Sequence, residues 1–358
     1  MSNALTLVRQ IMLLALVLTL STSLIGYQQG AAAQTPSASQ VTPGASPVTQ
    51  TEDDTFPVSI TRSDGVTLEI AERPERIVSL SAGGTELFFA IGAGDQLVAA
   101  DMFSDYPEEA NALPKVDSFQ PDPEAILAHN PDLVLVTYDA DGIVAALEQT
   151  GVPVLYLEVP ESLDGLLEQA RQFGKITGNR EAAEELVAGM EERIAAVTSK
   201  VANVENGPRI YHELDETFFT VAPDSFVGDL YNLLNAQNIA AGAPGGYPQL
   251  SAEAIIEQNP EVIILPTGEG EDGTTPEDVK ARPGWDVIDA VENDRIYEID
   301  RDIVSRPGPR IIDGLEQLAK LLYPETVATS QPLFILRSDT FASNQHVFTA
   351  SLDQRITA

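Results

Sequence analysis

Short apolar runs alternate with amphipathic stretches through most of the chain. Each run is short enough to be a buried strand. These predicted strands lie at 76–80, 97–100, 152–157, 209–214, 262–265 and 295–299. Before them, residues 57–70 alternate apolar and polar positions around Ser63-Asp64-Gly65, which predicts a hairpin. Strands separated by helical segments indicate βαβ units, so the predicted fold class is α/β with mainly parallel sheets.

One segment of this pattern occurs twice. Residues 118–136 read SFQPDPEAILAHNPDLVLV, and residues 247–265 read YPQLSAEAIIEQNPEVIIL. Each copy predicts a short helix with a glutamate in its first turn, Glu124 or Glu253, then an Asn-Pro break and an apolar strand. The copies are 129 residues apart (253 − 124), which is too long for a solenoid repeat and suits a duplicated domain. The chain is therefore predicted to contain two similar lobes.

A long helical stretch at 163–201 separates the two lobes, with a pause at Thr177-Gly178-Asn179. Its apolar residues fall on one face and are flanked by charged residues. We interpret the stretch as one long α-helix that bridges the lobes and leaves little hinge motion between them. The expected organisation is a signal peptide at 1–33, a Pro/Ser/Thr-rich linker at 34–55, an N-terminal lobe at 56–160, a bridging helix region at 161–203, a C-terminal lobe at 204–325 and a tail at 326–358, to which the pattern assigns no role.

The N-terminus has the pattern of an export signal. Arg9 precedes an apolar run at 11–20, and Ala31-Ala32-Ala33 supplies small residues for cleavage. The alternative is that the segment is kept as a membrane anchor. The chain contains no cysteine, which excludes disulfides and thiolate metal sites. We expect an extracytoplasmic protein, periplasmic or at the cell surface, that is not a lipoprotein.

Charge and motifs narrow the function classes. Lys and Arg number 20 against 55 Asp and Glu, and the formal charge of −35 argues against nucleic acid or an anionic membrane as partner. The sequence has no GxSxG, Walker A or HExxH motif and no cysteine nucleophile. We therefore expect a binding protein that has no cofactor and is not an enzyme.

The two repeated glutamates are candidates for contact with a partner. Each one alone is explained by the preference for acidic residues in the first turn of a helix. Their occurrence at the same place in both copies favours symmetric contacts with a two-fold partner, in which carboxylates would pair with arginines.

Aromatic residues gather after the predicted strands. Ligands of open α/β sheets bind outside the carboxyl ends of strands, so we expect these residues to line a cleft shared by the lobes. Any one of them alone is more often a core residue. The candidate ligand-binding residues are Phe103, Phe119, Tyr138, Phe219 and Tyr247, with Arg306 as positive charge for an anionic ligand. His212, late in a predicted strand, is the histidine to consider as a metal or haem ligand.

Several stretches together resemble one family, the substrate-binding proteins of ABC importers for vitamin B12, ferric siderophores and haem. They lie between about Phe56 and Pro324 and read RPERIVSL, TELFFAIGAG, FSDYPEEA, LPKVDSFQPDPEAILAHNPDLVLV, PQLSAEAIIEQNPEVIIL, RPGWDVIDAV and RPGPRI. The resemblance implies two Rossmann-like lobes bridged by one long α-helix, the class III periplasmic binding protein architecture. It also implies that Glu124 and Glu253 dock on permease arginines, and that Phe103, Phe119, Tyr247 and Arg306 lie near the ligand.

The function implied by the resemblance is capture of a metal-chelate nutrient and its delivery to an ABC permease dimer with its ATPase. Ferric siderophore and cobalamin rank close together as ligands, and haem, held by Tyr247 or His212, ranks third. We expect a monomer. The alternatives are a nitrogenase-like or chelatase-like metal enzyme or chaperone on the same frame, and a sensor or scavenger without its own permease.

Overall fold

The computed structural model describes residues 56–268 and 273–328. The expected signal peptide, the linker at 34–55 and the tail beyond residue 328 lie outside these residues. Among the described residues, no helix combines the length and the apolarity needed to span a bilayer.

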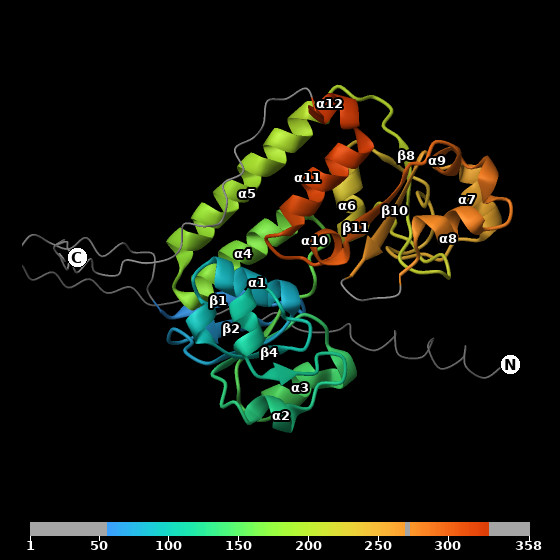
Figure 1. The fold of residues 1–358 in the computed structure, drawn as a ribbon. Coiled ribbons are helices and arrows are strands. Elements are labelled where there is room, and N and C mark those ends of the chain that lie inside the picture. The colour runs from blue at the N-terminus through green and yellow to red at the C-terminus, as the bar shows by residue number, and fades with distance from the viewer. Residues whose placement is uncertain (1–55, 269–272, 329–358) are drawn as a thin grey trace, which may run out of the picture. The chain divides into compact units, whose positions relative to one another are not determined.

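A five-stranded parallel sheet organises the first half of the described chain (Figure 1). Its spatial order is β5 (Lys115–Val116), β4 (Leu97–Asp101), β3 (Ile77–Leu80), β6 (Leu133–Val136) and β7 (Val154–Tyr156). All four residues of β3 and of β6 are buried, because helices and loops cover both faces of a parallel sheet. The predicted hairpin is confirmed as the antiparallel pair β1 (Val58–Thr61) and β2 (Thr67–Ile70).

The connections of this sheet are short helices. They are α1 (Ala82–Ala90), η2 (Gly94–Gln96), η3 (Glu108–Ala112), α2 (Pro123–Leu127), η4 (Ala140–Gly142) and α3 (Ile143–Glu148). Ser81 begins α1 by accepting a hydrogen bond from the Gly84 amide at 3.1 Å.

The second half contains a four-stranded parallel sheet. Its order is β11 (Ile296–Asp300), β10 (Val262–Thr267), β8 (Arg209–His212) and β9 (Gln237–Asn238). Its helices are α6 (Phe226–Leu233), α7 (Ala252–Gln258), α8 (Pro276–Ala281), η5 (Trp285–Val287), α9 (Asp289–Glu292), α10 (Arg301–Ser305), α11 (Ile311–Leu322) and α12 (Pro324–Ala328). The α/β class with parallel sheets is confirmed.

The bridging stretch is two helices, α4 (Leu163–Thr177) and α5 (Arg180–Val201). They divide at the predicted pause, because Gly178 adopts a left-handed conformation (φ +71°) that ends α4. The chain then reverses, and Arg171 of α4 pairs with Glu191 of α5 at 2.8 Å. The predicted helical stretch is therefore two helices packed on each other, and the long helix expected to bridge the lobes is confirmed as α5, which has 22 residues.

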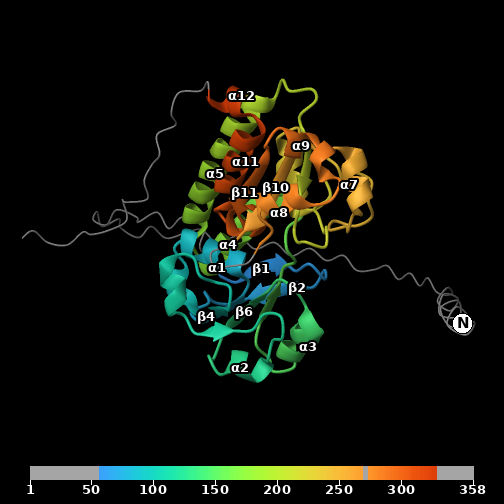
Figure 2. The ribbon, with the colours of Figure 1, turned by 45° about the vertical axis from the view of Figure 1, so that its right-hand side comes forward.

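Helix α5 contacts both halves of the described chain. One end lies against α4, and the other lies beside α11 and α12 (Figures 1 and 2). Arg193 of α5 pairs with Glu316 of α11 at 2.9 Å. Buried residues of the first sheet, α4, α5 and α11 form one continuous hydrophobic cluster that includes Ile77, Phe173 and Leu315. This shared core favours a rigid connection.

The duplicated segment is duplicated in backbone geometry as well. Asp122 caps α2 and Ser251 caps α7 through hydrogen bonds from the first turn. Asn130 and Asn259 then both adopt a left-handed conformation, with φ of 49° and 48°. The Asn-Pro break of each copy is therefore the turn that leads its helix into strand β6 or β10.

A second duplicated contact was not identified from the sequence. Arg76 Nε donates to the carbonyl of Asn130 at 2.8 Å, and Arg209 Nε donates to the carbonyl of Asn259 at 2.8 Å. Arg76 directly precedes β3 and Arg209 is the first residue of β8, in the related segments RIV and RIY. Each half therefore fastens its repeated turn to its sheet by the same interaction.

Candidate functional site

Exposed aromatic side chains gather after strand ends. Six aromatic residues among those described are exposed, by 39 to 67% of their surface. They are Phe103 and Tyr106 after β4, Phe119 after β5, Tyr138 after β6, Phe219 after β8 and Tyr247 after β9. Five of these six are the predicted ligand-binding aromatics, and all six follow the carboxyl ends of parallel strands, where ligands of such sheets bind.

Two of the predicted aromatics meet on the first sheet. The rings of Phe103 and Phe119 pack edge to face with centroids 5.5 Å apart. Each backbone amide donates to an aspartate two residues earlier, Phe103 to Asp101 at 2.7 Å and Phe119 to Asp117 at 2.8 Å. These tight turns fix the direction in which the chain leaves β4 and β5, so both rings project from neighbouring strand ends.

Two further aromatics lie on adjacent segments of the second sheet. Phe219 forms an antiparallel bridge with Gln249, and the amide of Thr220 donates to the carbonyl of Pro248 at 2.9 Å. Tyr247 stands two residues before Gln249, so it lies on the segment beside Phe219. Tyr138 remains on the first sheet, exposed after β6.

Below Phe103 lies a buried polar network that sequence reasoning did not find. Ser104 donates to Asp101 at 3.0 Å and bonds Thr85 at 3.0 Å, and Thr85 reaches Ser79 at 3.0 Å. All four side chains belong to buried residues. Burial raises the pKa of Asp101, against hydrogen bonds from Phe103 and Ser104 that lower it. The network holds the loop that carries Phe103 onto the ends of β3 and β4.

Arg306 lies where the two halves touch. Its guanidinium contacts Asp105 at 2.7 Å and Glu86 at 3.2 Å, both in the first half, and Asp302 at 2.8 Å. Burial opposes the charge of Asp105, but hydrogen bonding and the charge of Arg306 outweigh it and hold the pKa of Asp105 below its usual value. Arg310 binds the same Glu86 at 2.7 Å.

This junction leaves no room for side chains at two glycines. A Cβ on Gly83 would lie 2.3 Å from the carbonyl oxygen of Pro307, and one on Gly308 would lie 2.8 Å from Glu86 Oε2. Glycine at both positions therefore allows α1 to approach the segment after α10. The sequence does not mark Glu86 as a site residue, because its partners are 220 and 224 residues away.

A cavity of about 600 Å³ opens at the carboxyl end of the second sheet. It is lined by residues that follow β8, by residues at and after the end of β10, and by Arg282 and Arg301. Glu213, whose side chain is fully buried, receives two hydrogen bonds of 2.6 Å from Arg282. The same guanidinium stacks over Phe218 and Trp285, at 5.0 and 4.5 Å from the ring centres. This platform was also missed, although its arginine stands in the segment RPGWD.

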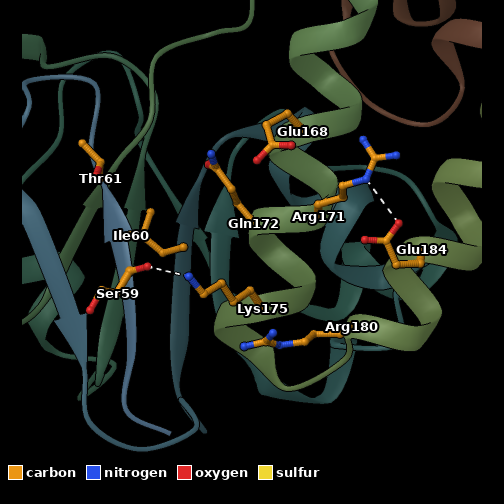
Figure 3. Close-up of a pocket in the computed structure, with 9 residues that line it drawn as sticks. All are labelled: Ser59, Ile60, Thr61, Glu168, Arg171, Gln172, Lys175, Arg180 and Glu184. Atoms are coloured by element: carbon orange, nitrogen blue, oxygen red, sulfur yellow. Dashed lines mark hydrogen bonds and ion pairs between the residues drawn. The ribbon is translucent and has the colours of Figure 1, made fainter. Parts of the chain in front are cut away.

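A second cavity, of about 440 Å³, lies away from these strand ends, between β1, α4 and the start of α5 (Figure 3). Its lining is mostly polar and charged, and side chains of the lining bind other residues of the lining. Lys175 donates to the carbonyl of Ser59 at 2.8 Å, and Arg171 pairs with Glu184 at 3.2 Å. Because it lacks exposed aromatic rings, we place the candidate ligand site at the strand ends instead.

His212 occupies the end of β8, as its position in the sequence indicated, but its ring has no exposed surface. Nδ1 bonds the hydroxyl of Tyr231 at 2.7 Å, and Nε2 is buried without a partner. Neither nitrogen reaches the surface where the aromatics lie, so the geometry does not suit the haem contact considered above. Within residues 56–268 and 273–328, no group of three metal-ligating side chains is assembled.

The buried imidazole should make stability depend on pH. Burial lowers the pKa of His212 from about 6.5 to about 3. As pH falls below 6.5 the unfolded chain binds the proton first, so stability is full above pH 6.5 and is lost towards pH 3. By pH 5 the loss is about 2 kcal/mol. Denaturant unfolding between pH 7 and 5 should show this slope in the native protein and in Tyr231→Phe, and should lose it in His212→Gln; equal slopes in all three would contradict the assignment.

The repeated glutamates occupy equivalent places. Glu124 and Glu253 are each the second residue of their helix, α2 or α7, and both are exposed. Within the described part of the chain, no contact of either side chain stabilises the fold. Both side chains are accessible to a partner.

Comparison with known proteins identifies the family. The family model described as periplasmic binding protein matches residues 77–303. The chain belongs to the periplasmic binding protein family. It is 31% identical over 280 residues to an ABC transporter substrate-binding lipoprotein of Bacillus subtilis, which is uncharacterised, with 76% of this chain and 87% of the relative covered.

Solved structures share the fold. The periplasmic vitamin B12-binding protein of Vibrio cholerae matches with 27% identity and a TM-score of 0.61, covering 72% of this chain and all of that one. A periplasmic haem-binding protein of Roseiflexus in its apo form matches with 26% identity and a TM-score of 0.63, covering 70% of this chain and 99% of that one. These neighbours support the class III architecture.

One expectation from the sequence is overturned. We expected a protein that is not a lipoprotein, whereas the Bacillus relative is itself a lipoprotein. The exclusion of a lipoprotein is therefore withdrawn. An extracytoplasmic location agrees with the family.

Proposed function

We propose that this protein is the extracytoplasmic substrate-binding component of an ABC importer and captures a metal-chelate nutrient. The observation that carries the proposal is the gathering of all six exposed aromatic residues of the described chain at the carboxyl ends of both sheets. Flat apolar surfaces at that edge suit a large ligand that is buried by stacking and held by few polar contacts. The contacting residues in this proposal are Phe103, Phe119, Tyr138, Phe219 and Tyr247, with Arg306 near them at the junction of the two halves.

Among ligands, ferric siderophore and cobalamin rank first. The two solved structures do not separate cobalamin from haem, because their identities to this chain are 27% and 26%. Two observations support ranking haem third. His212 is buried, and burial raises the pKa of Tyr247, which disfavours the phenolate that would ligate iron.

Delivery is proposed to use the matched glutamates. Glu124 and Glu253 have the same position in their helices and are exposed. A permease dimer offers two equivalent surfaces, and one arginine on each would pair with one carboxylate. In this proposal the protein is a monomer without enzymatic activity, and the ATPase of the importer supplies the energy.

The ligand site is tested by replacing the exposed aromatics. Tyr247→Ala and Phe119→Ala should each weaken binding by about 1–3 kcal/mol, because each removes a buried stacking surface from the complex. Binding of ferric siderophores, cyanocobalamin and haemin to the purified protein is followed by absorbance and by fluorescence of Trp285, the single tryptophan.

The matched control is Val287→Ala, which truncates an exposed apolar side chain at the end of η5. It should leave affinity unchanged. Native affinity in both aromatic variants would move the site elsewhere, and no binding of any of these ligands would contradict the proposed function.

A further inference from the structure

The charges at the strand ends identify the kind of chelate that the site accepts. We propose that the ligand is a neutral or cationic metal chelate, and that anionic chelates are disfavoured. The inference rests on the proposed function, because it concerns the same site.

The guanidiniums at this edge are already engaged by carboxylates of the protein. Arg306 contacts Glu86, Asp105 and Asp302, and Arg310 contacts Glu86 at 2.7 Å and Asp302 at 3.6 Å. An anionic ligand group would have to displace these carboxylates or bind beside them. Either process costs free energy, because it leaves a largely buried charge without its partner.

The second sheet repeats this arrangement. Arg282 gives both arms of its guanidinium to Glu213, and its face is covered by Phe218 and Trp285. Arg301, which also lines the cavity there, has an interaction partner as well. The cations of this edge therefore stabilise the protein and are not presented to a ligand.

Lys115 of β5 is also engaged within the protein, in this case by main-chain oxygens. Its ammonium group donates to the carbonyl of Ala110 at 2.9 Å and to that of Ser104.

Carboxylates, in contrast, are exposed at the same edge. Those at or after strand ends include Asp105, Asp139, Asp141, Asp215, Glu216 and Asp300. Asp105 keeps 58% of its side chain exposed although it pairs with Arg306. The potential that a ligand meets is therefore negative, which attracts cations and repels anions.

This charge pattern changes the expected role of Arg306. The sequence suggested that it supplies positive charge for an anionic ligand. In the structure it joins the two halves through carboxylates. The polar groups that remain exposed at the edge are the carboxylates of its ion pairs, such as Asp105. The aromatic rings then supply most of the contact area and the carboxylates select by charge.

The test is a series of chelates that share a metal and differ in charge. The probes are a neutral ferric trihydroxamate, the same chelate with a pendant amine, and a multiply anionic ferric triscatecholate, with cyanocobalamin as a neutral chelate of another metal. We expect the neutral and cationic chelates to bind at least about tenfold more tightly than the anionic one. Added salt should weaken the cationic chelate and strengthen the anionic one.

A variant shows whether these carboxylates cause the preference. Asp105→Asn removes one negative charge at the edge and should shift the ratio of cationic to anionic affinity by roughly three- to tenfold towards the anion. Glu292→Gln is the control, because this exposed residue precedes β11 and lies at the opposite edge of its sheet. Thermal unfolding of both variants reports whether either change disturbs the fold.

The possible results separate the two proposals. Tightest binding of the anionic chelate would overturn the charge inference and leave the proposed function standing. Equal affinity for all charges, or an equal response of Asp105→Asn and Glu292→Gln, would also overturn it. If none of the probes binds, the proposed function is contradicted, and the charge inference that rests on it is contradicted as well.

Discussion

Replacing Glu86 with glutamine is expected to lower the free energy of unfolding by roughly 3–5 kcal/mol. The Glu86 side chain is 1% exposed, and it is shared by Arg306 and Arg310, which are 12% and 18% exposed. Glutamine keeps the shape but removes the charge, so two largely buried guanidiniums lose their common carboxylate. The measurement is chemical or thermal unfolding of the native protein and the variant.

The control for Glu86→Gln is an ion pair near the surface. Asp313→Asn breaks the contact with Arg193 at 2.5 Å, where the side chains are 52% and 41% exposed. This change should cost less than about 1 kcal/mol, because solvent screens exposed pairs. If both variants lose the same stability, Glu86 does not hold the junction. Ligand affinity should also fall in Glu86→Gln, since the two sheet edges are joined by this carboxylate.

Reversing both repeated glutamates is expected to abolish uptake while ligand affinity and thermal stability stay native. Glu124→Lys with Glu253→Lys replaces two attractive contacts by two repulsive ones, and facing like charges cost several kcal/mol. Uptake of labelled ligand in cells that carry the importer should fall at least about tenfold. Each single variant should give an intermediate loss, because one contact remains.

The control for the docking pair changes the net charge by the same amount elsewhere. Glu185→Lys with Glu192→Lys alters two exposed residues of α5. Uptake should be retained in this variant. Normal uptake in the Glu124 and Glu253 double variant would exclude these residues as the docking contacts. A fall in ligand affinity there would show that the reversal acts on the ligand site.

Much of the architecture could be predicted from local pattern. The hairpin at Val58–Ile70, the buried strands and the repeated helix starts follow from alternation, apolar runs and capping residues, which act between neighbours in the chain. The sequence showed a pause in the helical pattern at Gly178, but it did not show that the chain reverses there. Whether a glycine interrupts a helix or reverses the chain depends on what packs against it, here α4 on α5.

The candidate site was predicted in part. The aromatic residues were identified because they follow strand ends, and the structure leaves them exposed. Glu86, Glu213 and Arg282 were missed, because nothing in their neighbouring residues marks them as partners. His212 was placed at a strand end, although the sequence did not show that Tyr231 would enclose it.

The sequence by itself determined the α/β class, the duplication, and the matched glutamates Glu124 and Glu253, because spacing and helix-start chemistry are local properties. Only the tertiary structure decided which charges meet. Glu86 and Arg306 are 220 residues apart and come together because α1 and the segment after α10 pack at one junction. Packing across such separations depends on how two sheets are joined, and it turns Arg306 from the free positive charge expected from the sequence into a neutralised link between the halves, at the edge of the proposed ligand site.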